Sequence, residues 1–177
     1  FVGSAKDEKA VLIEVSPNNF GVYEVDNSNH LICSNHFQSA AYTNDKQNQK
    51  HIFESHSKYR YERMEELLSE TQKMNPERAV EVLRNREGLD DKKIGYGNEK
   101  ALNQLLAHHG IVFQPHDLKV WVSSNPFQLG EFVAYDLNEV FQKTGTSETP
   151  ATVSHPSANI DEDPFVNSLA FEHYNRY

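Results

Sequence analysis

The feature that most constrains the fold is a change in the spacing of apolar residues, which occurs twice along the chain. Residues 10–34 form short runs rich in β-branched and aromatic side chains, as is typical of strands. From Tyr59 onward the apolar residues recur about every 3.6 positions, as they do on an amphipathic helix. After Gly110 the spacing returns to about two. This order of strands, helices and strands predicts an α+β fold in which helices pack on antiparallel sheets.

The expected elements follow from this spacing and from the turn residues between the runs. Strands are expected over residues 10–16, 20–25 and 30–34, and again over 111–113, 118–123 and 131–135. Helices are expected from the segment 57–60, from Asn75-Pro76 to Gly88, from Asn98 to Gly110, and from Asp163-Pro164. The polar stretch 38–56 is interpreted as a long exposed loop.

Composition narrows the classes of function. The chain has 177 residues, of which 37% are hydrophobic, which is enough for one domain with a core. Its 17 basic and 26 acidic residues give a net charge of −9, which disfavours nucleic acid and anionic membranes as partners. No apolar run approaches the roughly 20 residues of a membrane-spanning helix. The single cysteine excludes cysteine-based zinc motifs, and the nine histidines are scattered, so neither a metal nor a cofactor is expected.

Several short segments form a further pattern when they are taken in order. They are Val11-Leu-Ile-Glu-Val-Ser-Pro17, Ser34-Asn-His-Phe37, Ser57-Lys-Tyr-Arg-Tyr-Glu-Arg63, Gly97-Asn98, and His109-Gly-Ile-Val-Phe-Gln-Pro115 with Val120-Trp-Val-Ser123. This ordered set resembles the penicillin acyltransferase and linear-amide hydrolase type of N-terminal-nucleophile (Ntn) hydrolase, peptidase family C45. The resemblance covers most of residues 1–140. It implies that the chain forms part of the four-layer αββα sandwich of the Ntn hydrolases.

The resemblance also implies a reaction and the residues that support it. A cysteine freed by autoproteolysis uses its own α-amino group as base, and its thiol attacks a small-molecule amide to give a thioester that passes to water or to an amine. Asn35 would present its side-chain amide to the developing oxyanion. Arg60 would lie near the cysteine and hold its charge state or a substrate carboxylate. His36 and Phe37 would line the substrate pocket.

The chain departs from the family pattern in two ways. Ser34 stands where threonine is expected, and the N-terminal cysteine is missing. The nucleophile is therefore expected upstream of Phe1, on an N-terminal portion of the same protein that would be a second partner. Residues 1–142 are expected to form the C-terminal portion of the Ntn-hydrolase-like domain, 143–163 a linker, and 164–177 the start of a truncated helix.

Other interpretations compete with these assignments. Asparagine is a common turn former and a helix arginine is usually solvated, so Asn35 and Arg60 each have a structural explanation. Cys33 is a rival nucleophile, although a cysteine within a strand is most often a small buried hydrophobe. The alternative class is a non-catalytic α+β binding or interaction domain. A separation of Asn35 and Arg60 well beyond ~10 Å would favour that class, because the members of one active site share a reacting atom.

Overall fold

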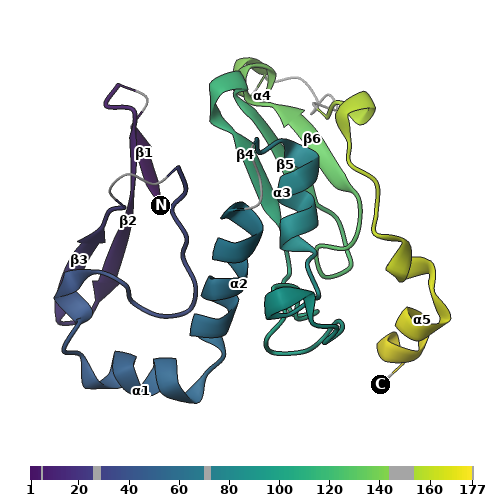
Figure 1. Cartoon of the computed structure of the whole chain (residues 1–177). Helices are drawn as coiled ribbons and strands as arrows, with labels where there is room; N and C mark the ends of the chain where they lie inside the picture. The colour runs from purple at the N-terminus through teal and green to yellow at the C-terminus, as the bar shows by residue number, and fades with distance from the viewer. Residues whose placement is uncertain (5, 26–28, 70–72, 144–153, 177) are drawn as a thin grey trace. The chain divides into compact units, whose positions relative to one another are not determined.

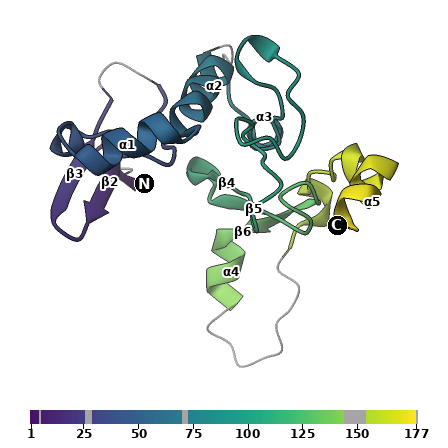
Figure 2. The same ribbon diagram turned by 90° about the horizontal axis from the view of Figure 1, so that it is seen from below.

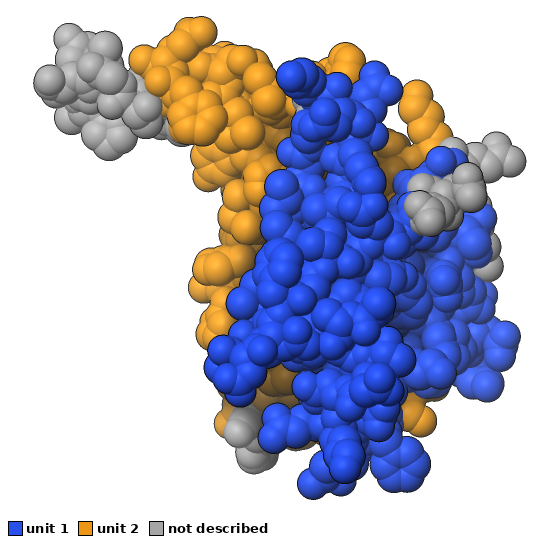
Figure 3. Space-filling view, turned by 90° about the vertical axis from the view of Figure 1, so that its left-hand side faces the viewer, with its two compact units in different colours: residues 1–71, 88–92 blue, residues 72–87, 93–177 orange. Residues whose placement is uncertain are grey.

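The computed structural model describes residues 1–4, 6–25, 29–69, 73–143 and 154–176. These residues form two three-stranded antiparallel sheets and five α-helices (Figure 1). The chain divides into two compact units, the first made of residues 1–71 with 88–92 and the second of residues 72–87 with 93–177 (Figure 3). The α+β class with antiparallel sheets, which the spacing of apolar residues predicts, is confirmed.

The first unit is built on the sheet β1-β2-β3. Its strands are Val2–Ser4, Lys9–Ser16 and Asn19–Tyr23, and β2 pairs antiparallel with a neighbour on each side. Ser16 pairs with Asn19, so the two residues between them form a tight turn. Because side chains alternate along a strand, Leu12 and Glu14 are buried on the same face of β2. A carboxylate thus lies on the inner face of this strand beside a core leucine.

The outer face of this sheet is apolar and exposed. Ile13 pairs with Val22 and Val15 pairs with Phe20, and the four side chains are between 41% and 65% exposed. Apolar cross-strand pairs of this kind contribute to the stability of a sheet even at its surface. We refer to these four residues as the outer strip of the first sheet.

The strand predicted over residues 30–34 is wrong, because residues 29–39 follow an irregular path. Their backbone groups bond to side chains instead of to a neighbouring strand. Gln38 Nε2 donates to the Ile32 carbonyl, and the Asn48 side chain accepts from the Phe37 N–H and donates to the Phe37 carbonyl. Buried backbone groups need hydrogen bonds, and side chains satisfy that need here in place of a ladder.

Residues 38–56 are not the exposed loop that their polarity predicts. They contain a short 3-10 turn, Ala40–Tyr42, and the helix α1, Lys46–Glu54. Asp45 caps α1 by accepting a hydrogen bond from the Asn48 N–H at 2.8 Å. The buried residue of α1 is the polar Asn48, which explains why the spacing of apolar residues does not reveal this helix.

The helices predicted near Ser57 and at Asn75 are confirmed, except that the second ends at Leu83 and not at Gly88. The helix α2 runs over Ser57–Ser69 and α3 over Pro76–Leu83. Asn75 caps α3, since its side chain accepts from the Arg78 N–H at 2.8 Å, and Pro76 occupies the first turn. The 3-10 turn Leu89–Asp91 follows later in the chain and belongs to the first unit.

The second unit is built on the sheet β4-β5-β6, which confirms the meander predicted after Gly110. Its strands are Ile111–Gln114, Lys119–Ser123 and Phe132–Asp136, and the pairing is antiparallel. The turn Pro115–Asp117 joins the first two strands. The helix α3 packs on one face of this sheet, where Val80 meets Val112, Trp121, Phe132 and Ala134 in the core. The helix α4, Leu137–Lys143, begins directly where β6 ends (Figure 2).

The helix predicted from Asn98 to Gly110 is wrong. The segment is irregular, and Leu105 has a φ of 54°, which does not fit a right-handed helix. Asn103 is fully buried and makes bonds that replace the helical pattern: it accepts from the Leu105 N–H and donates to the Phe127 carbonyl. A buried asparagine thus sets the path of this segment, whereas its leucines suggested an amphipathic helix.

Part of the predicted linker is held on the second sheet. Residues 144–153 lie outside the described residues, but residues 154–160, with the 3-10 turn Pro156–Ala158, lie against β6. Ile160 and Phe132 exchange two backbone hydrogen bonds, and the Trp121 ring donates to the Ala158 carbonyl at 2.8 Å. The division of the chain into a domain, a linker and a terminal helix stays a prediction.

The last helix differs from its expected form. Asp163 caps a 3-10 turn, Pro164–Asn167, and the helix α5, Leu169–Asn175, begins only after Ser168. Of the apolar residues of α5, Phe171 is buried whereas Leu169 is 84% exposed. The shift arises because Ser168 accepts from the Phe171 N–H and so starts a new helix with its own cap.

A tyrosine makes the stability of the second unit sensitive to alkaline pH. The Tyr96 hydroxyl donates to Asp163 Oδ2 at 2.8 Å, and the Arg86 guanidinium lies 4.7 Å from the ring centre. Burial, and then the hydrogen bond and charge of Asp163, raise the pKa of Tyr96 to about 12. The folded state therefore favours the neutral phenol. This contribution to stability is fully present below the ordinary tyrosine pKa of about 10 and is lost as the pH rises above it.

We predict that the free energy of unfolding falls between about pH 10 and about pH 12, and that Tyr96→Phe flattens the fall in this window. Trp121 is the single tryptophan and lies in the core of the same unit, so its fluorescence follows denaturant-induced unfolding. Measurements at roughly pH 7 to 9 are the control, because the difference between wild type and variant should be constant there. Parallel curves through the alkaline window would contradict the prediction.

Candidate functional site

Asn35 and Arg60, the two residues expected to support catalysis, are in direct contact. The Arg60 guanidinium donates from Nη2 to Asn35 Oδ1 at 2.8 Å. Asn35 belongs to the irregular segment 29–39 and Arg60 to the first turn of α2, so the contact joins two elements of the first unit. Arginine carries only donors, so it must face the amide oxygen and leave the Asn35 Nδ2 hydrogens for another acceptor. The wide separation that would have favoured a binding domain is not found.

His36 is tied to the start of α2 through a fully buried serine. Its Nδ1 lies 2.8 Å from Ser57 Oγ, and Ser57 Oγ also lies 3.0 Å from Ser34 Oγ. The ring meets Tyr61 edge-on, with the ring centres 5.9 Å apart. Burial lowers the pKa of His36 below its ordinary value, although the Glu14 carboxylate opposes this effect, so the folded state favours the neutral imidazole.

Phe37 is fixed through its ring as well as through its backbone. The ring stacks on buried Tyr42, with the ring centres 3.9 Å apart and the planes at 12°. The Tyr42 hydroxyl donates to the Asn19 carbonyl at 2.9 Å, which links this pair to the start of β3. The Asn48 side chain of α1 makes two hydrogen bonds to the Phe37 backbone. Phe37 therefore has little freedom to leave its place.

The carboxylate of Glu14 holds the end of the same segment. Its two oxygens accept from the backbone N–H groups of Gln38 and Ser39 at 2.7 and 2.8 Å, and the residue is only 5% exposed. Burial of a carboxylate is costly unless it is hydrogen-bonded, and the two amide donors supply those bonds. Ser39 also approaches β3 closely, since a Cβ at Gly21 would lie 2.1 Å from Ser39 Oγ. Glu14 and Gly21 together fix where the segment meets the sheet.

A cavity of about 670 Å³ lies against these residues. Its walls are residues 12–19, residues 33–37 and, from the region of α1, Asp45, Gln47, Asn48 and His51. Small-molecule sites have volumes of roughly 300–1,000 Å³, so this cavity is of ligand size. Asn35, His36 and Phe37, which were singled out from the sequence, line one concave surface.

Cys33 lines the same cavity, but its surroundings do not favour a nucleophile. Burial, and then the charge of Glu14, raise the pKa of the Cys33 thiol, which opposes the thiolate that nucleophilic attack requires. Its Sγ donates to the Ser34 carbonyl at 3.4 Å, and the Nδ1 atom of His36 is engaged by Ser57. The electrostatics therefore disfavour Cys33 as the rival nucleophile.

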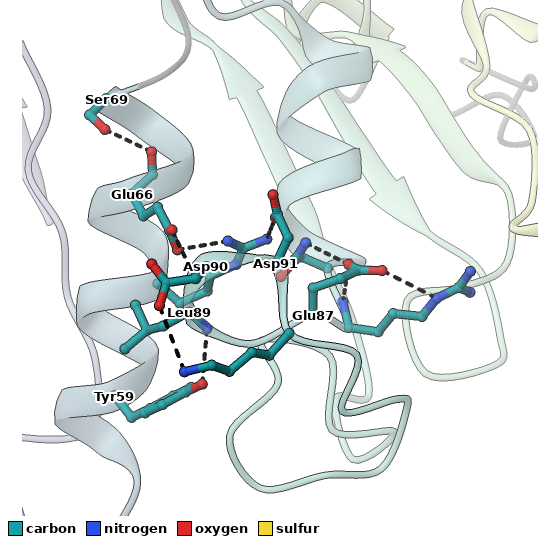
Figure 4. Close-up of polar contacts among 11 residues, drawn as sticks. Tyr59, Glu66, Ser69, Glu87, Leu89, Asp90 and Asp91 are labelled. Carbon is teal, nitrogen blue, oxygen red and sulfur yellow. Dashed lines mark hydrogen bonds and ion pairs between the residues drawn. The ribbon is translucent and has the colours of Figure 1, made fainter.

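The helix α2 is anchored by a buried arginine. Arg63 is 2% exposed and donates to Glu66 Oε2 and Asp91 Oδ1, both at 2.7 Å (Figure 4). The other Glu66 oxygen accepts from the Asp90 N–H at 3.0 Å. A charged group this deeply buried is tolerated because its donors are paired. The pairing ties the middle of α2 to residues 88–92 and steadies the helix that carries Arg60.

Sequence reasoning missed the residues that hold the site together. Glu14 carried a usable signal, because it is two residues from Leu12 and therefore lies on the same face of its strand. Ser57 and Arg63 are each three residues from Arg60 and so share one side of the helix with it. The spacing does not predict that Ser57 and Arg63 are buried, because serine and arginine are mostly exposed in proteins.

The described residues contain neither a candidate metal site nor a candidate membrane-spanning helix. No group of three or more histidine, cysteine, aspartate or glutamate side chains there is arranged to hold a metal ion. No helix in the same part of the chain has the length and apolar character needed to cross a membrane.

The sheets, the helices and the ligand-sized cavity are consistent with an α+β protein of the Ntn type. Residues 1–127 match the family described as acyl-coenzyme A:6-aminopenicillanic acid acyl-transferase, and the chain belongs to this family. The match spans the whole of the first unit and confirms the family expected from the sequence. Neither a curated protein nor a solved structure matches the chain.

We predict that Glu14→Gln lowers the free energy of unfolding by about 1–3 kcal/mol, because one of two buried N–H groups would then face an NH₂ group. Denaturant titration followed by circular dichroism measures the change. Glu62→Gln is the matched control, since Glu62 pairs with Lys58 at 3.7 Å on the surface of α2, where an ion pair contributes little. Equal stabilities of the two variants would contradict the role assigned to Glu14.

Proposed function

We propose that this chain is part of a cysteine Ntn amidohydrolase or acyltransferase that acts on linear amide (C–N) bonds through a thioester. In this proposal the nucleophilic cysteine lies upstream of the sequence in the full-length protein and is freed by autoproteolysis. Family membership supports the acyltransferase class. The observation that carries the assignment to this site is the contact of Arg60 with Asn35, which lines a cavity of ligand size.

Asn35 is the oxyanion donor in the proposed reaction. Attack of the thiol on an amide carbonyl converts a neutral oxygen into an oxyanion, and a donor aimed at that charge lowers the barrier. Since Oδ1 accepts from Arg60, the Nδ2 hydrogens are the groups that Asn35 offers. The positive charge on Arg60 polarises the amide, and hydrogen bonds in such a chain strengthen one another.

Arg60 also supplies a fixed positive charge. Arginine stays protonated under all ordinary conditions and offers a rigid fork, so it suits the charge of a thiolate or of a substrate carboxylate. The anchoring of α2 through Arg63 limits the movement of this charge. In the proposal Arg60 lies near the incoming cysteine and its α-amino group.

The proposed reaction has two steps, in which the acyl group passes first to the thiol and then to water or an amine. In the first step the thiol displaces the amine of the substrate, and the amine leaves with the thiol proton. In the second step water or an amine displaces the thiol from the thioester and gives an acid or a new amide. His36 and Phe37 line the pocket for the small-molecule substrate, and the sequence of steps needs neither a metal nor a cofactor.

The first test is the mass and N-terminal sequence of the mature full-length protein. We expect a new N-terminal cysteine that is produced by self-cleavage and is lost when that cysteine is replaced by alanine. An intact chain that also lacks a cysteine near its own start would overturn the proposal.

Asn35→Ala, introduced into the full-length protein, is predicted to lower kcat/KM for amide cleavage by about 10²–10³-fold, because one oxyanion donor is lost. Asn35→Asp is the matched variant, since it keeps the size and the contact with Arg60 but offers no N–H group. A comparable loss in both variants, at unchanged thermal midpoint, is the expected result. Activity retained by Asn35→Asp would show that the amide hydrogens are not needed.

A further inference from the structure

We infer that His36 is held as its Nδ1–H tautomer and that its unprotonated Nε2 accepts a hydrogen bond from an N–H or O–H donor of the ligand in the cavity. The tautomer follows from the hydrogen bonds among Ser34, His36 and Ser57. The identity of the ligand as a substrate rests on the proposed function.

The protons around Ser57 can be counted. Ser34 Oγ lies 2.9 Å from the Ser57 carbonyl and 3.0 Å from Ser57 Oγ, and His36 Nδ1 lies 2.8 Å from the same Oγ. Each hydroxyl has a single proton to donate. When Ser34 donates to the carbonyl and Ser57 donates to Ser34, both hydroxyl protons are used. The third contact then requires that Nδ1 itself carries a proton and donates it to Ser57.

The opposite tautomer leaves one of these contacts without a proton. With Nδ1 as an acceptor, Ser57 would donate to the ring, and Ser34 would have one proton for two neighbouring oxygens. Two oxygens at hydrogen-bond distance with no proton between them repel each other. Ser57 is fully buried, so solvent does not relieve that repulsion, and a buried polar group without a partner is costly.

The remaining edge of the ring has no partner within the described part of the chain. His36 belongs to the cavity wall, whereas Ser57, which engages Nδ1, does not. Within the described part of the chain, His36 Nε2 makes no hydrogen bond and is not one of the buried polar atoms that lack a partner. This nitrogen is therefore accessible to a bound molecule.

The surroundings of His36 keep its ring neutral. Burial is the largest cause of its lowered pKa, and the charges of His51, Lys58 and Arg60 act in the same direction, whereas Glu14 acts against them. A neutral ring with Nδ1 protonated has only an acceptor at Nε2. The complementary group on a ligand is a donor, such as the N–H of a linear amide or of an attacking amine. A carbonyl or carboxylate oxygen placed there would be repelled.

The tautomer can be measured directly in the ¹⁵N-labelled full chain. Long-range ¹H–¹⁵N correlations of the imidazole rings distinguish the two tautomers, and the signals that disappear in His36→Asn identify His36. We expect a neutral Nδ1–H ring at pH 7. An Nε2–H ring, or a doubly protonated one, would overturn the inference.

Two serine variants test the proton count. Ser34→Ala releases the Ser57 proton, which can then be donated to Nδ1, so the population should move toward Nε2–H. Ser57→Ala removes the acceptor of the Nδ1 proton and should also weaken the preference. Ser69→Ala, on the exposed end of α2, is the control and should leave the tautomer unchanged. If Ser57→Ala does not fold, Ser34→Ala decides alone, and an unchanged tautomer in it overturns the count.

Turnover of an amide by the full-length protein tests the second half of the inference. His36→Asn keeps a donor near the position of Nδ1 but has no counterpart of Nε2, so KM should rise a few-fold to about tenfold at unchanged thermal midpoint. An unchanged KM would overturn the role of Nε2 in binding. Absence of turnover in the wild-type protein would instead count against the proposed function, while the measured tautomer would still stand or fall by itself.

Discussion

The buried carboxylate of Glu14 is the interaction on which the first unit depends. It comes from the central strand of the sheet and accepts the backbone N–H groups of Gln38 and Ser39. Among the described residues, the segment before them pairs with no strand, so these two bonds, with those of Asn48, replace a ladder. Asn35 and His36 are thereby held in place by groups that take no part in the chemistry proposed for them. A rigid frame of this kind is what a site needs if its donors are to be aimed before a ligand arrives.

One face of the helix α2 carries three residues with different structural roles. Ser57 at its start orients the imidazole of His36, Arg60 contacts the Asn35 amide, and Arg63 is buried in an ion pair. The three residues follow each other at intervals of three, which a helix places on adjacent positions of one face. This face is polar and yet largely turned away from water. Stability in this part of the molecule therefore depends on satisfied polar contacts as much as on apolar burial.

Residue patterns in the sequence correctly predicted those elements whose conformation depends on residues that are close together in the chain. The cap at Asn75 and the alternating strands after Gly110 were readable because the residues that form them are neighbours in the sequence. The predictions for segments 30–34 and 98–110 were wrong, since the conformation of these segments depends on partners that are distant in sequence, such as Ser57 and Phe127. The same limit applies to the site. The resemblance indicated Asn35 and Arg60, but the orientation of the Asn35 amide follows only from its contact with the arginine.

The outer strip of the first sheet has a consequence for the behaviour of the protein at high concentration. Ile13, Val15, Phe20 and Val22 expose apolar surface on a chain whose net charge is −9. At low ionic strength the like charges of neighbouring molecules keep such surfaces apart. At physiological salt the Debye length shortens to about 8 Å, and the repulsion no longer extends far beyond the surface. Raising the ionic strength thus weakens the charge repulsion that opposes the approach of two copies through this face.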